Sequence, residues 1–384
     1  MATVKLDDVA CEVRESWKAD RAGVPVVGLE HLEPDEIWLR HWDVNPDENT
    51  FSKGFKMGQL LFGRRRAYQK KMSIAPCDGI CSGDITVIAA KPEKILPELL
   101  PFYLRTDAFF DFAMRGSGGS LSPRVKWSHI AGYEFDLPPL DEQRKLADLL
   151  WAANDLKEKY KKAIAASDEM LKAKFREMFG GCGEGNGDSR GGAETRKIPR
   201  RKIGELCKLM NGFAFQSKNY VSEGIRVIRI ANVQKGYIED LSPVYYPISE
   251  RESLSQFLLE ENDLLLSLTG NVGRVALLQK ELLPAGLNQR VACLRIVDAS
   301  VLDKQFLFSV MNNENFENDC IGSAKGSAQK NMSTEWLKEY EVPTPPLALQ
   351  QQFVEIARKA DETKAALKKS INDVEQVIKG LING

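Results

Sequence analysis

One long internal duplication constrains this sequence of 384 residues more than any other feature. Short segments of the first half recur in the second half in the same order. Four pairs of segments carry the similarity: 5–9 and 202–206, 23–29 and 224–230, 60–62 and 264–266, and 133–143 and 340–350. The separation within a pair grows steadily along the chain, from 197 to 207 residues, as small insertions in one copy would make it. The sequence therefore predicts two copies of one module.

Each module begins with roughly 135 residues in which strand-like and helix-like patterns alternate. Short apolar runs predict strands at 24–29, 85–89, 225–230 and 291–296, and longer amphipathic runs predict helices at 97–112 and 302–316. These patterns indicate a mixed fold of the α+β (or α/β) class. A long helix is expected to follow in each module, because Pro-Pro precedes both segments and proline is tolerated only before or within a first helical turn.

Both predicted long helices carry apolar or small residues at alternating steps of three and four. In the first helix these positions are 146, 149, 153, 156, 160, 163, 167 and 170, and in the second 353, 356, 360, 363, 367, 370, 374, 377 and 381. Such heptads are typical of a coiled coil, and two matched helices can each cover the other's apolar stripe. The alternative is that each helix packs only on its own module.

A glycine-rich segment separates the two modules. Residues 180–192 contain seven glycines in thirteen positions, a composition typical of a flexible linker. The expected organisation is a first domain at 1–140, a first coiled-coil helix at 141–179, a linker at 180–200, a second domain at 201–346 and a second coiled-coil helix at 347–384.

Composition narrows the class of protein. Hydrophobic residues make up 43% of the sequence and charged residues 28%, which is typical of a globular protein. The sequence has no apolar run long enough to span a bilayer and no signal peptide at its start. We therefore expect a soluble cytoplasmic protein without membrane association. The seven cysteines form no CxxC pair and the three histidines have no metal-ligand spacing, so no disulfide framework and no metal site are expected.

Motifs for catalysis are missing. The sequence has no Asn/Asp-Pro-Pro-aromatic loop of an adenine methyltransferase, no phosphate-binding GxxxxGK[ST] motif and no cluster of carboxylates with a lysine for a metal-dependent nuclease. Serine, cysteine and histidine are too scattered to suggest a catalytic triad. We therefore expect no catalytic residues and no cofactor.

The segments that follow the two aligned strands at 60–62 and 264–266 are the first candidates for contact with DNA. In the first module this segment lies in a stretch, 51–77, with seven basic residues and no acidic one, and in the second it is rich in hydroxyl and amide groups. Arginine and lysine bind phosphates or guanine, whereas serine, threonine and asparagine bind phosphates or adenine. The candidates are Arg64, Arg65, Arg66, Tyr68, Lys70 and Lys71 in the first module and Ser267, Thr269, Asn271 and Arg274 in the second. A purely solvated hairpin is the alternative.

A second pair of candidate segments precedes the long helices. Glycine and serine let backbone N–H groups approach a phosphate, and the basic residues add charge. The candidates are Ser120, Arg124 and Lys126 in the first module and Lys325 and Lys330 in the second, together with Gln216, Lys218, Asn288, Gln289 and Arg290, which belong to the second module only.

The order of these motifs resembles a known family, the specificity subunits of type I restriction–modification systems. The resemblance rests on the Leu137–Gln143 segment, Gly212–Phe215, Ser267–Gly273 and Asn288–Arg290 within the duplicated frame. Two features depart from it: Ala348-Leu349 replaces Asp-Glu before Gln350, and the first module lacks the Gly-Phe-x-Phe and Ser-x-Thr-Gly motifs. Its Asp78–Ser82 run instead resembles another subgroup of target-recognition domain.

The resemblance implies a DNA-recognition subunit without its own active site. Two target-recognition domains, held apart by an antiparallel coiled coil, would each bind one half of a split double-stranded DNA site. Methyltransferase (M) subunits and restriction/translocase (R) subunits would be its protein partners. A stand-alone DNA-binding regulator and a coiled-coil scaffold remain as alternatives.

Overall fold

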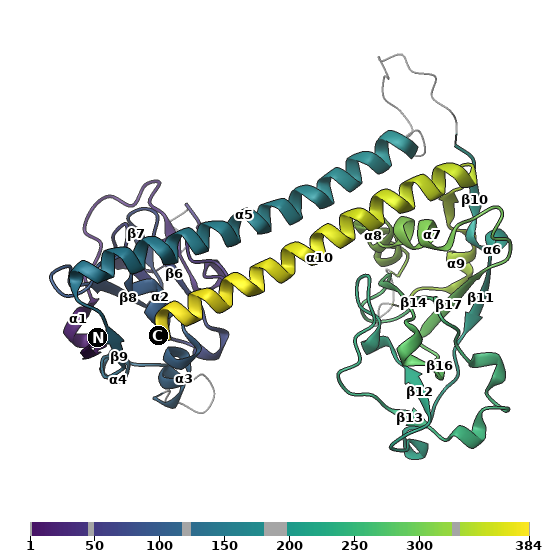
Figure 1. Cartoon of the computed structure of the whole chain (residues 1–384), viewed down its shortest axis with the longest axis horizontal. Helices are drawn as coiled ribbons and strands as arrows, with labels where there is room; N and C mark the ends of the chain where they lie inside the picture. The colour runs from purple at the N-terminus through teal and green to yellow at the C-terminus, as the bar shows by residue number, and fades with distance from the viewer. Residues whose placement is uncertain (1, 45–49, 117–123, 180–197, 325–330, 384) are drawn as a thin grey trace, which may run out of the picture. The chain divides into compact units, whose positions relative to one another are not determined.

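The computed structural model describes residues 2–44, 50–116, 124–179, 198–324 and 331–383 (Figure 1). The chain divides into two compact units. The first contains Met1–Ala163 and Ala366–Gly384, and the second contains Ile164–Ala365. Each unit therefore holds one globular part and one end of each long helix, α5 (Leu140–Phe179) and α10 (Leu347–Asn383).

The first unit is built on a four-stranded antiparallel sheet of order β2-β8-β5-β6. A smaller sheet has the order β3-β7-β4, with β3 and β7 parallel, and β1 pairs with β9. The strands are β1 (Ala2–Lys5), β2 (Ala10–Val13), β3 (Val26–Val27), β4 (Lys53–Phe55), β5 (Leu60–Gly63), β6 (Met72–Ile74), β7 (Gly79–Cys81), β8 (Ile85–Ala90) and β9 (Glu134–Leu137). The short helices are α1 (Leu6–Val9), α2 (Leu100–Leu104), α3 (Asp107–Arg115) and α4 (Trp127–Ile130).

The second unit repeats the four-stranded sheet, the parallel strand pair and the pairing of its first and last strands, but the third strand of its smaller sheet lies beside the other member of the parallel pair. Its four-stranded sheet has the order β11-β17-β14-β15, its smaller sheet has the order β13-β12-β16 with β12 and β16 parallel, and β10 pairs with β18. The strands are β10 (Arg200–Lys202), β11 (Cys207–Asn211), β12 (Ile225–Ile228), β13 (Tyr245–Tyr246), β14 (Leu264–Ser267), β15 (Val275–Leu277), β16 (Ala285–Leu287), β17 (Val291–Ile296) and β18 (Glu341–Pro343). The short helices are α6 (Ile203–Leu206), α7 (Lys304–Met311), α8 (Glu314–Ser323) and α9 (Thr334–Glu339).

The mixed class predicted from the sequence is confirmed, and the central strands show why their sequences are continuously apolar. In β5, Leu60 and Phe62 belong to one hydrophobic cluster and Leu61 belongs to another. In β14, Leu264 and Leu266 likewise face one cluster and Leu265 faces another. Successive side chains of a strand point to opposite faces of its sheet, so both faces of these sheets are covered.

The helices predicted at 97–112 and 302–316 are each divided in two. The first part, α2, ends at Leu104, and Thr106 caps α3 by accepting a hydrogen bond from the N–H of Phe109. Asn313 does the same for α8 by accepting from the N–H of Phe316. Both are good N-cap residues, which an amphipathic pattern alone does not reveal inside a longer apolar run.

A buried glutamine fixes the start of each long helix. The amide of Gln143 donates to the carbonyl oxygens of Lys94 and Pro138 at 3.1 and 2.9 Å, and its oxygen accepts from the N–H of Leu96 at 2.9 Å. Gln350 donates to Val301 and Pro345 at 2.8 and 2.7 Å and accepts from the N–H of Asp303 at 2.8 Å. In both modules the glutamine side chain therefore satisfies two backbone carbonyl oxygens and one backbone N–H at equivalent positions.

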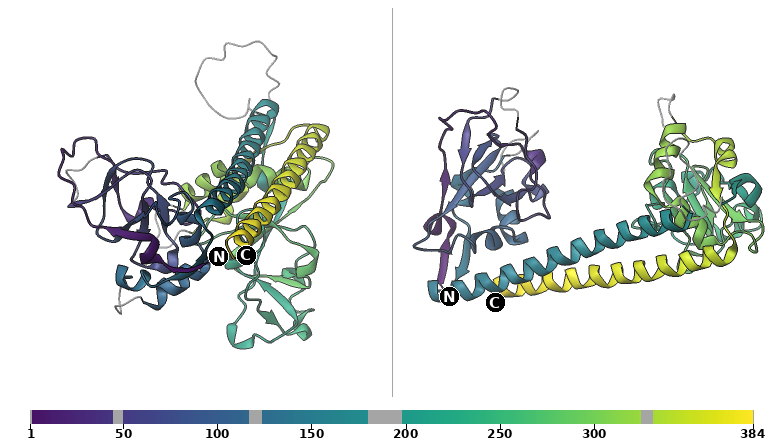
Figure 2. Two further views of the ribbon diagram at one scale, coloured as in Figure 1. Left: turned by 60° about the vertical axis from the view of Figure 1, so that its left-hand side comes forward. Right: turned by 90° about the horizontal axis from the view of Figure 1, so that it is seen from above.

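In each unit the two long helices run in opposite directions beside one another (Figures 1 and 2). In the first unit, Ile378 and Leu381 of α10 pack on the same core as Trp151 of α5, and Lys157 lies 3.6 Å from Glu375. No described helix is apolar enough over a sufficient length to cross a membrane.

In the second unit the aromatic end of α5 enters the core. Phe179 is buried and packs against Phe306 and Phe353, with ring centroids 5.2 and 5.5 Å apart. Lys364 of α10 forms an ion pair with Asp168 of α5 at 2.9 Å. Each globular core is therefore completed by residues from both long helices.

Half of the predicted heptad positions on α5 lie on its less exposed side, since 146, 153, 160 and 167 are partly buried. Leu149, Leu156 and Met170 occupy predicted seam positions, yet they are 56, 39 and 50% exposed. The less exposed side also includes 147, 150, 154, 157, 161, 164, 168 and 171. Because this set includes Lys157 and Asp168, a search for apolar residues alone does not identify all of it. On α10 the predicted positions 363 and 377 are exposed, whereas 353 and 360 are buried.

We expect Gln350→Met to destabilise the second unit by at least about 2 kcal/mol, because three buried backbone groups lose their partner and each such loss costs about 1–3 kcal/mol. The measurement is chemical or thermal unfolding of the full chain. Gln351→Met is the matched control, because the same change is made at the next residue, where the side chain is exposed. Equal effects of the two substitutions would contradict this role for Gln350.

Candidate nucleic-acid interface

The structure joins the two candidate DNA-binding segments of each module through backbone hydrogen bonds. In the first unit, the N–H of Arg64 donates to the carbonyl oxygen of Asp84 at 2.9 Å, and the N–H of Val125 donates to the carbonyl oxygen of Arg64 at 2.8 Å. Arg65 and Arg124 then form an isolated antiparallel bridge. The end of β5, the start of β8 and the segment before α4 therefore meet at one place.

The second unit repeats this arrangement. The N–H of Leu268 donates to the carbonyl oxygen of Arg290 at 3.0 Å, and the N–H of Met332 donates to the carbonyl oxygen of Leu268 at 2.9 Å. Thr269 and Asn331 form the corresponding bridge. We call this arrangement the loop junction. Its side chains come from Arg65, Asp84 and Arg124 in the first unit and from Thr269, Arg290 and Asn331 in the second.

The loop junction of the first unit is held by a carboxylate. Asp84 accepts a hydrogen bond from Nε of Arg124 at 2.7 Å, and its other oxygen lies 3.5 Å from Nη1 of Arg65. Although partial burial of Asp84 would raise its pKa, the charges and hydrogen bonds of Arg124 and Arg65 hold the pKa below its ordinary value. The group is therefore ionised at neutral pH, with two guanidinium groups beside it.

Other predicted residues of the basic segment have different surroundings. Arg66 is exposed, whereas Lys70 forms an ion pair with Asp107 at 2.6 Å and Lys71 donates to the carbonyl oxygen of Leu29 at 2.7 Å. Tyr68 is 58% exposed. Arg66 and Tyr68 are thus better placed for an external ligand than the two lysines.

Arg66 also adopts a backbone conformation that favours glycine. Its φ is 55°, and Gly270, at the corresponding place of the second module, has a φ of 67°. A left-handed conformation costs a non-glycine residue roughly 1–2 kcal/mol. Strain of this kind concentrates at functional sites, so an exposed arginine kept in this conformation supports a role for its side chain in binding.

In the second module, one predicted residue is structural. Ser267 is fully buried, donates to the carbonyl oxygen of Asn271 at 2.5 Å and accepts from the N–H of Arg274 at 3.0 Å. It shapes the turn and leaves Asn271 exposed, with Thr269 half-buried beside it. The side chain of Arg274 donates to Gln234 at 2.5 Å.

The structure also connects two of the predicted motifs of this module. Phe213 forms a parallel bridge with Asn288, and the N–H of Gln289 donates to the carbonyl oxygen of Phe213 at 3.0 Å. The residues Gln216, Lys218, Gln289 and Arg290 are exposed, and Asn288 accepts from the N–H of Arg290 at 3.3 Å. This group adjoins the loop junction, because Arg290 belongs to both.

Two residues of the loop junction were not predicted as DNA contacts. Asp84 is acidic, so its residue type does not suggest phosphate binding. Asn331 lies in a predicted segment whose candidates are the basic residues Lys325 and Lys330. The duplication could have revealed Asp84, because it and Arg290 each precede the aligned strands β8 and β17. Lys126 is exposed before α4, and Ser120, Lys325 and Lys330 lie outside the described residues.

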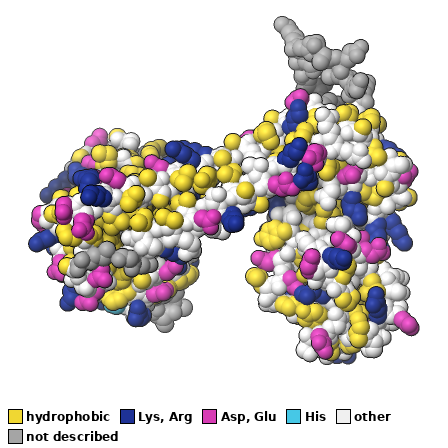
Figure 3. Space-filling model, in the orientation of Figure 1, with side chains coloured by type: hydrophobic (Ala, Val, Ile, Leu, Met, Phe, Trp, Pro, Cys, Tyr) yellow, Lys and Arg dark blue, Asp and Glu magenta, His cyan; other side chains and the backbone are white. Residues whose placement is uncertain are grey.

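Surface charge alone does not identify the interface. On the face drawn in Figure 3, Lys and Arg side chains are interspersed with Asp and Glu on the described part of each unit. The loop junction is distinguished by its geometry, which is the same in both units although its side chains differ.

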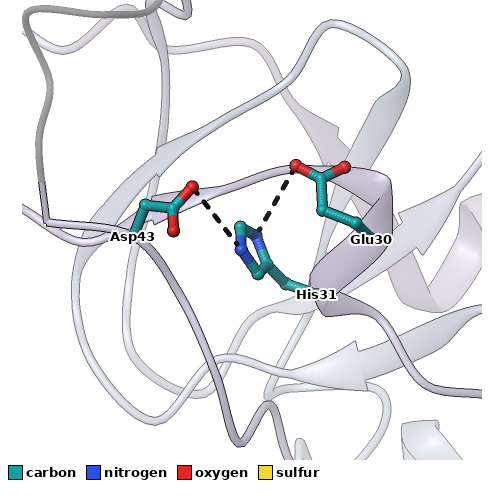
Figure 4. Close-up of side chains that lie close together, drawn as sticks. All are labelled: Glu30, His31 and Asp43. Atoms are coloured by element: carbon teal, nitrogen blue, oxygen red, sulfur yellow. Dashed lines mark ion pairs between the residues drawn. The ribbon is translucent and has the colours of Figure 1, made fainter. Parts of the chain in front are cut away.

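One group of described residues has the donors for a metal ion: Glu30, His31 and Asp43 (Figure 4). Nδ1 of His31 accepts a hydrogen bond from the N–H of Gly28 at 2.9 Å, and Nε2 lies 3.7 Å from Asp43. Asn232 accepts the equivalent bond from Arg229 in the second module, also at 2.9 Å. The shared geometry indicates a cap of a short helical turn, η1 (Leu29–His31) in the first module, and does not favour metal coordination.

We expect His31→Asn to preserve the stability of the first unit, because asparagine makes this cap in the second module, and His31→Ala to cost about 1 kcal/mol. The midpoint of thermal unfolding measures both effects. Added Zn²⁺ should leave the midpoint of the unmodified protein unchanged. A rise that His31→Asn abolishes would show that the group binds metal.

Comparison with known families gives one match to a family model. The model describes a type I restriction modification DNA specificity domain, and residues 197–376 match it. Among curated proteins, the MjaVIII specificity subunit of a type I restriction enzyme of Methanocaldococcus jannaschii is 25% identical over 348 residues, covering 86% of this chain and 76% of that protein. The EcoAI specificity subunit of Escherichia coli is 29% identical over 182 residues, covering 46% of this chain and 29% of that protein.

Solved structures share the fold. A chain from a study of complex assembly and conformational transition of the type I R–M system matches with a TM-score of 0.58 and 18% identity, covering 99% of this chain and 96% of that one. The S subunit of a type I restriction-modification system from M. genitalium matches with a TM-score of 0.57 and 11% identity, covering 100% and 95%.

Proposed function

Because this chain belongs to the family of type I restriction–modification DNA specificity subunits, we propose that it recognises a split double-stranded DNA site, with one half-site bound by each module. The observation that carries this proposal is the loop junction. Its backbone is the same in both units, but its side chains differ. Two modules that share a backbone arrangement but carry different polar side chains are suited to recognising two different base sequences.

The side chains of each junction suit the chemistry of a DNA groove. In the first module, Arg65 and Arg124 offer planar guanidinium groups, which pair with two acceptors of guanine or with phosphate. In the second, Thr269, Asn271 and Asn331 offer hydroxyl and amide groups, and asparagine pairs with adenine. Arg290 adds one positive charge there.

We propose that the chain contributes recognition and that methyltransferase and restriction subunits contribute the chemistry. The exposed apolar stripe of α5 is a candidate surface for such partners. In the first unit it includes Leu149 and Leu156, which lie seven residues apart on one face of the helix. Neighbouring exposed apolar side chains on one helix face can form the kind of apolar patch that marks a protein–protein interface.

Arg66→Gly is expected to weaken DNA binding without lowering stability. The substitution removes a cation at the interface, which should reduce the magnitude of the salt slope by up to about 0.9, and it relieves the left-handed backbone. The measurements are the dissociation constant at several salt concentrations and the midpoint of unfolding.

Lys70→Gly is the matched control, because Lys70 is also basic and left-handed, with a φ of 52°, but is paired with Asp107. We expect it to change the salt slope less than Arg66→Gly. An unchanged slope after Arg66→Gly would remove Arg66 from the interface.

The split site itself is tested by mapping the bases methylated in cells that contain the chain and its methyltransferase. We expect two short half-sites with a fixed gap. We further propose that the long helices set this gap. Inserting one heptad in both helices, between Lys157 and Asp168 and between Lys364 and Glu375, adds about 10 Å. At about 3.4 Å per base pair, the gap should grow by about three base pairs.

A whole heptad keeps the buried face of each helix in phase, whereas a four-residue insertion would rotate it. A single continuous recognition sequence would contradict the proposed function. An unchanged gap in a stably folded double insertion would leave the function intact and exclude the helices as its ruler.

A further inference from the structure

We propose that Asp84 is a positioning residue that sets the base preference of the first module by orienting Arg65 and Arg124, and that Arg290, at the same place in the second module, contacts DNA directly. This inference rests on the proposed function and assigns a role to one defined position in each module. The negatively charged carboxylate of Asp84 repels phosphate, so its presence at a DNA interface requires a physical explanation.

The equivalence of Asp84 and Arg290 is structural. Each accepts, through its carbonyl oxygen, the N–H of the first residue after the central strand, at 2.9 Å from Arg64 and 3.0 Å from Leu268. Each lies immediately before the six-residue strand that pairs with that central strand. The backbone therefore presents the two side chains from the same position.

The partners of this position differ in charge. In the first module the bridge beside it joins two arginines, and like charges directly opposite one another are destabilising. Asp84 compensates them by contacting both guanidinium groups, at 2.7 Å for Arg124 and 3.5 Å for Arg65. In the second module the bridge joins Thr269 and Asn331, which are uncharged, so no counter-ion is needed and Arg290 is exposed.

The carboxylate fixes orientation while leaving donors for DNA. Arg124 contacts Asp84 through Nε, and its side chain is 50% exposed. A guanidinium group has five N–H donors in a rigid plane, so four remain beyond the one shared with Asp84. An arginine held in this way loses less conformational entropy when it binds a base edge, and it rejects a base that does not offer matching acceptors.

This arrangement predicts a change in sequence preference and little change in general affinity. A phosphate-binding role for the arginines alone would not require Asp84, because its negative charge weakens attraction to DNA. Removing that charge should therefore maintain or raise affinity for unrelated DNA, while the freed guanidinium groups discriminate less between bases.

The test uses the full chain with its methyltransferase subunits and DNA libraries in which one half-site at a time is randomised. For Asp84→Asn we expect the preference at one or two base pairs of the first half-site to fall on the order of tenfold, with the second half-site unchanged. Asp78→Asn is the matched control, because it removes the same charge from an exposed aspartate of the same unit that pairs with Lys56 instead. It should leave both half-sites unchanged.

Two further variants keep the test decisive. Arg124→Lys preserves the charge but removes the planar fork, so it should relax the same base pairs without altering the salt dependence. If Asp84→Asn does not fold, Arg124→Lys decides the outcome for the first module. Arg290→Gln should relax the second half-site only.

The inference is wrong if Asp84→Asn and Arg124→Lys leave the preference at the first half-site intact, or if they alter affinity equally for all sequences. It is also wrong for Arg290 if Arg290→Gln leaves the second half-site unchanged. These results differ from a failure of the proposed function, in which the unmodified protein would show no preference at either half-site.

Discussion

The buried amides of Gln143 and Gln350 fix the direction in which each long helix leaves its module. Each amide satisfies two backbone carbonyl oxygens and one backbone N–H, and the groups lie at equivalent places. An amide side chain supplies two donors and an acceptor together, whereas a hydroxyl group has only one donor, a carboxylate cannot donate and an ammonium group cannot accept. This requirement explains why glutamine occurs in both copies although the two residues before it differ, Asp-Glu in one and Ala-Leu in the other.

The helices that start from these anchors belong to both units, and their pairing depends on polar contacts as well as on packing. Near its far end, α5 inserts Phe179 into one core, and α10 packs Leu381 on the other. Along the helices, Lys157 pairs with Glu375 and Asp168 with Lys364. A shifted register would separate these opposite charges, so the two pairs favour one register of the helices. The two helices thus make apolar contacts at their ends and ion pairs between them along their length.

The sequence predicted those parts of the fold that depend on pattern. The duplication, the mixed class and the two long helices follow from repeated segments and periodicity, and they agree with the structure. Half of the predicted α5 seam, at 149, 156, 163 and 170, is exposed. Polar residues such as Lys157 and Asp168 occupy partly buried positions in its place, which an apolar pattern cannot identify. The division of the two longer predicted helices depends on the caps Thr106 and Asn313, whose effect is local and competes with an otherwise helical pattern.

The candidate interface was less predictable, because its two segments are distant in the sequence and meet only through backbone hydrogen bonds. Those bonds also explain how the interface can vary. The contacts from Arg64 to Asp84 and from Leu268 to Arg290 use main-chain atoms, so they are independent of the side chains. An acidic residue and a basic residue therefore occupy the same position without altering the frame. When the fold is carried by the backbone and by buried amides, the exposed side chains are free to differ between modules. A duplicated chain can in this way hold two different recognition surfaces on one architecture.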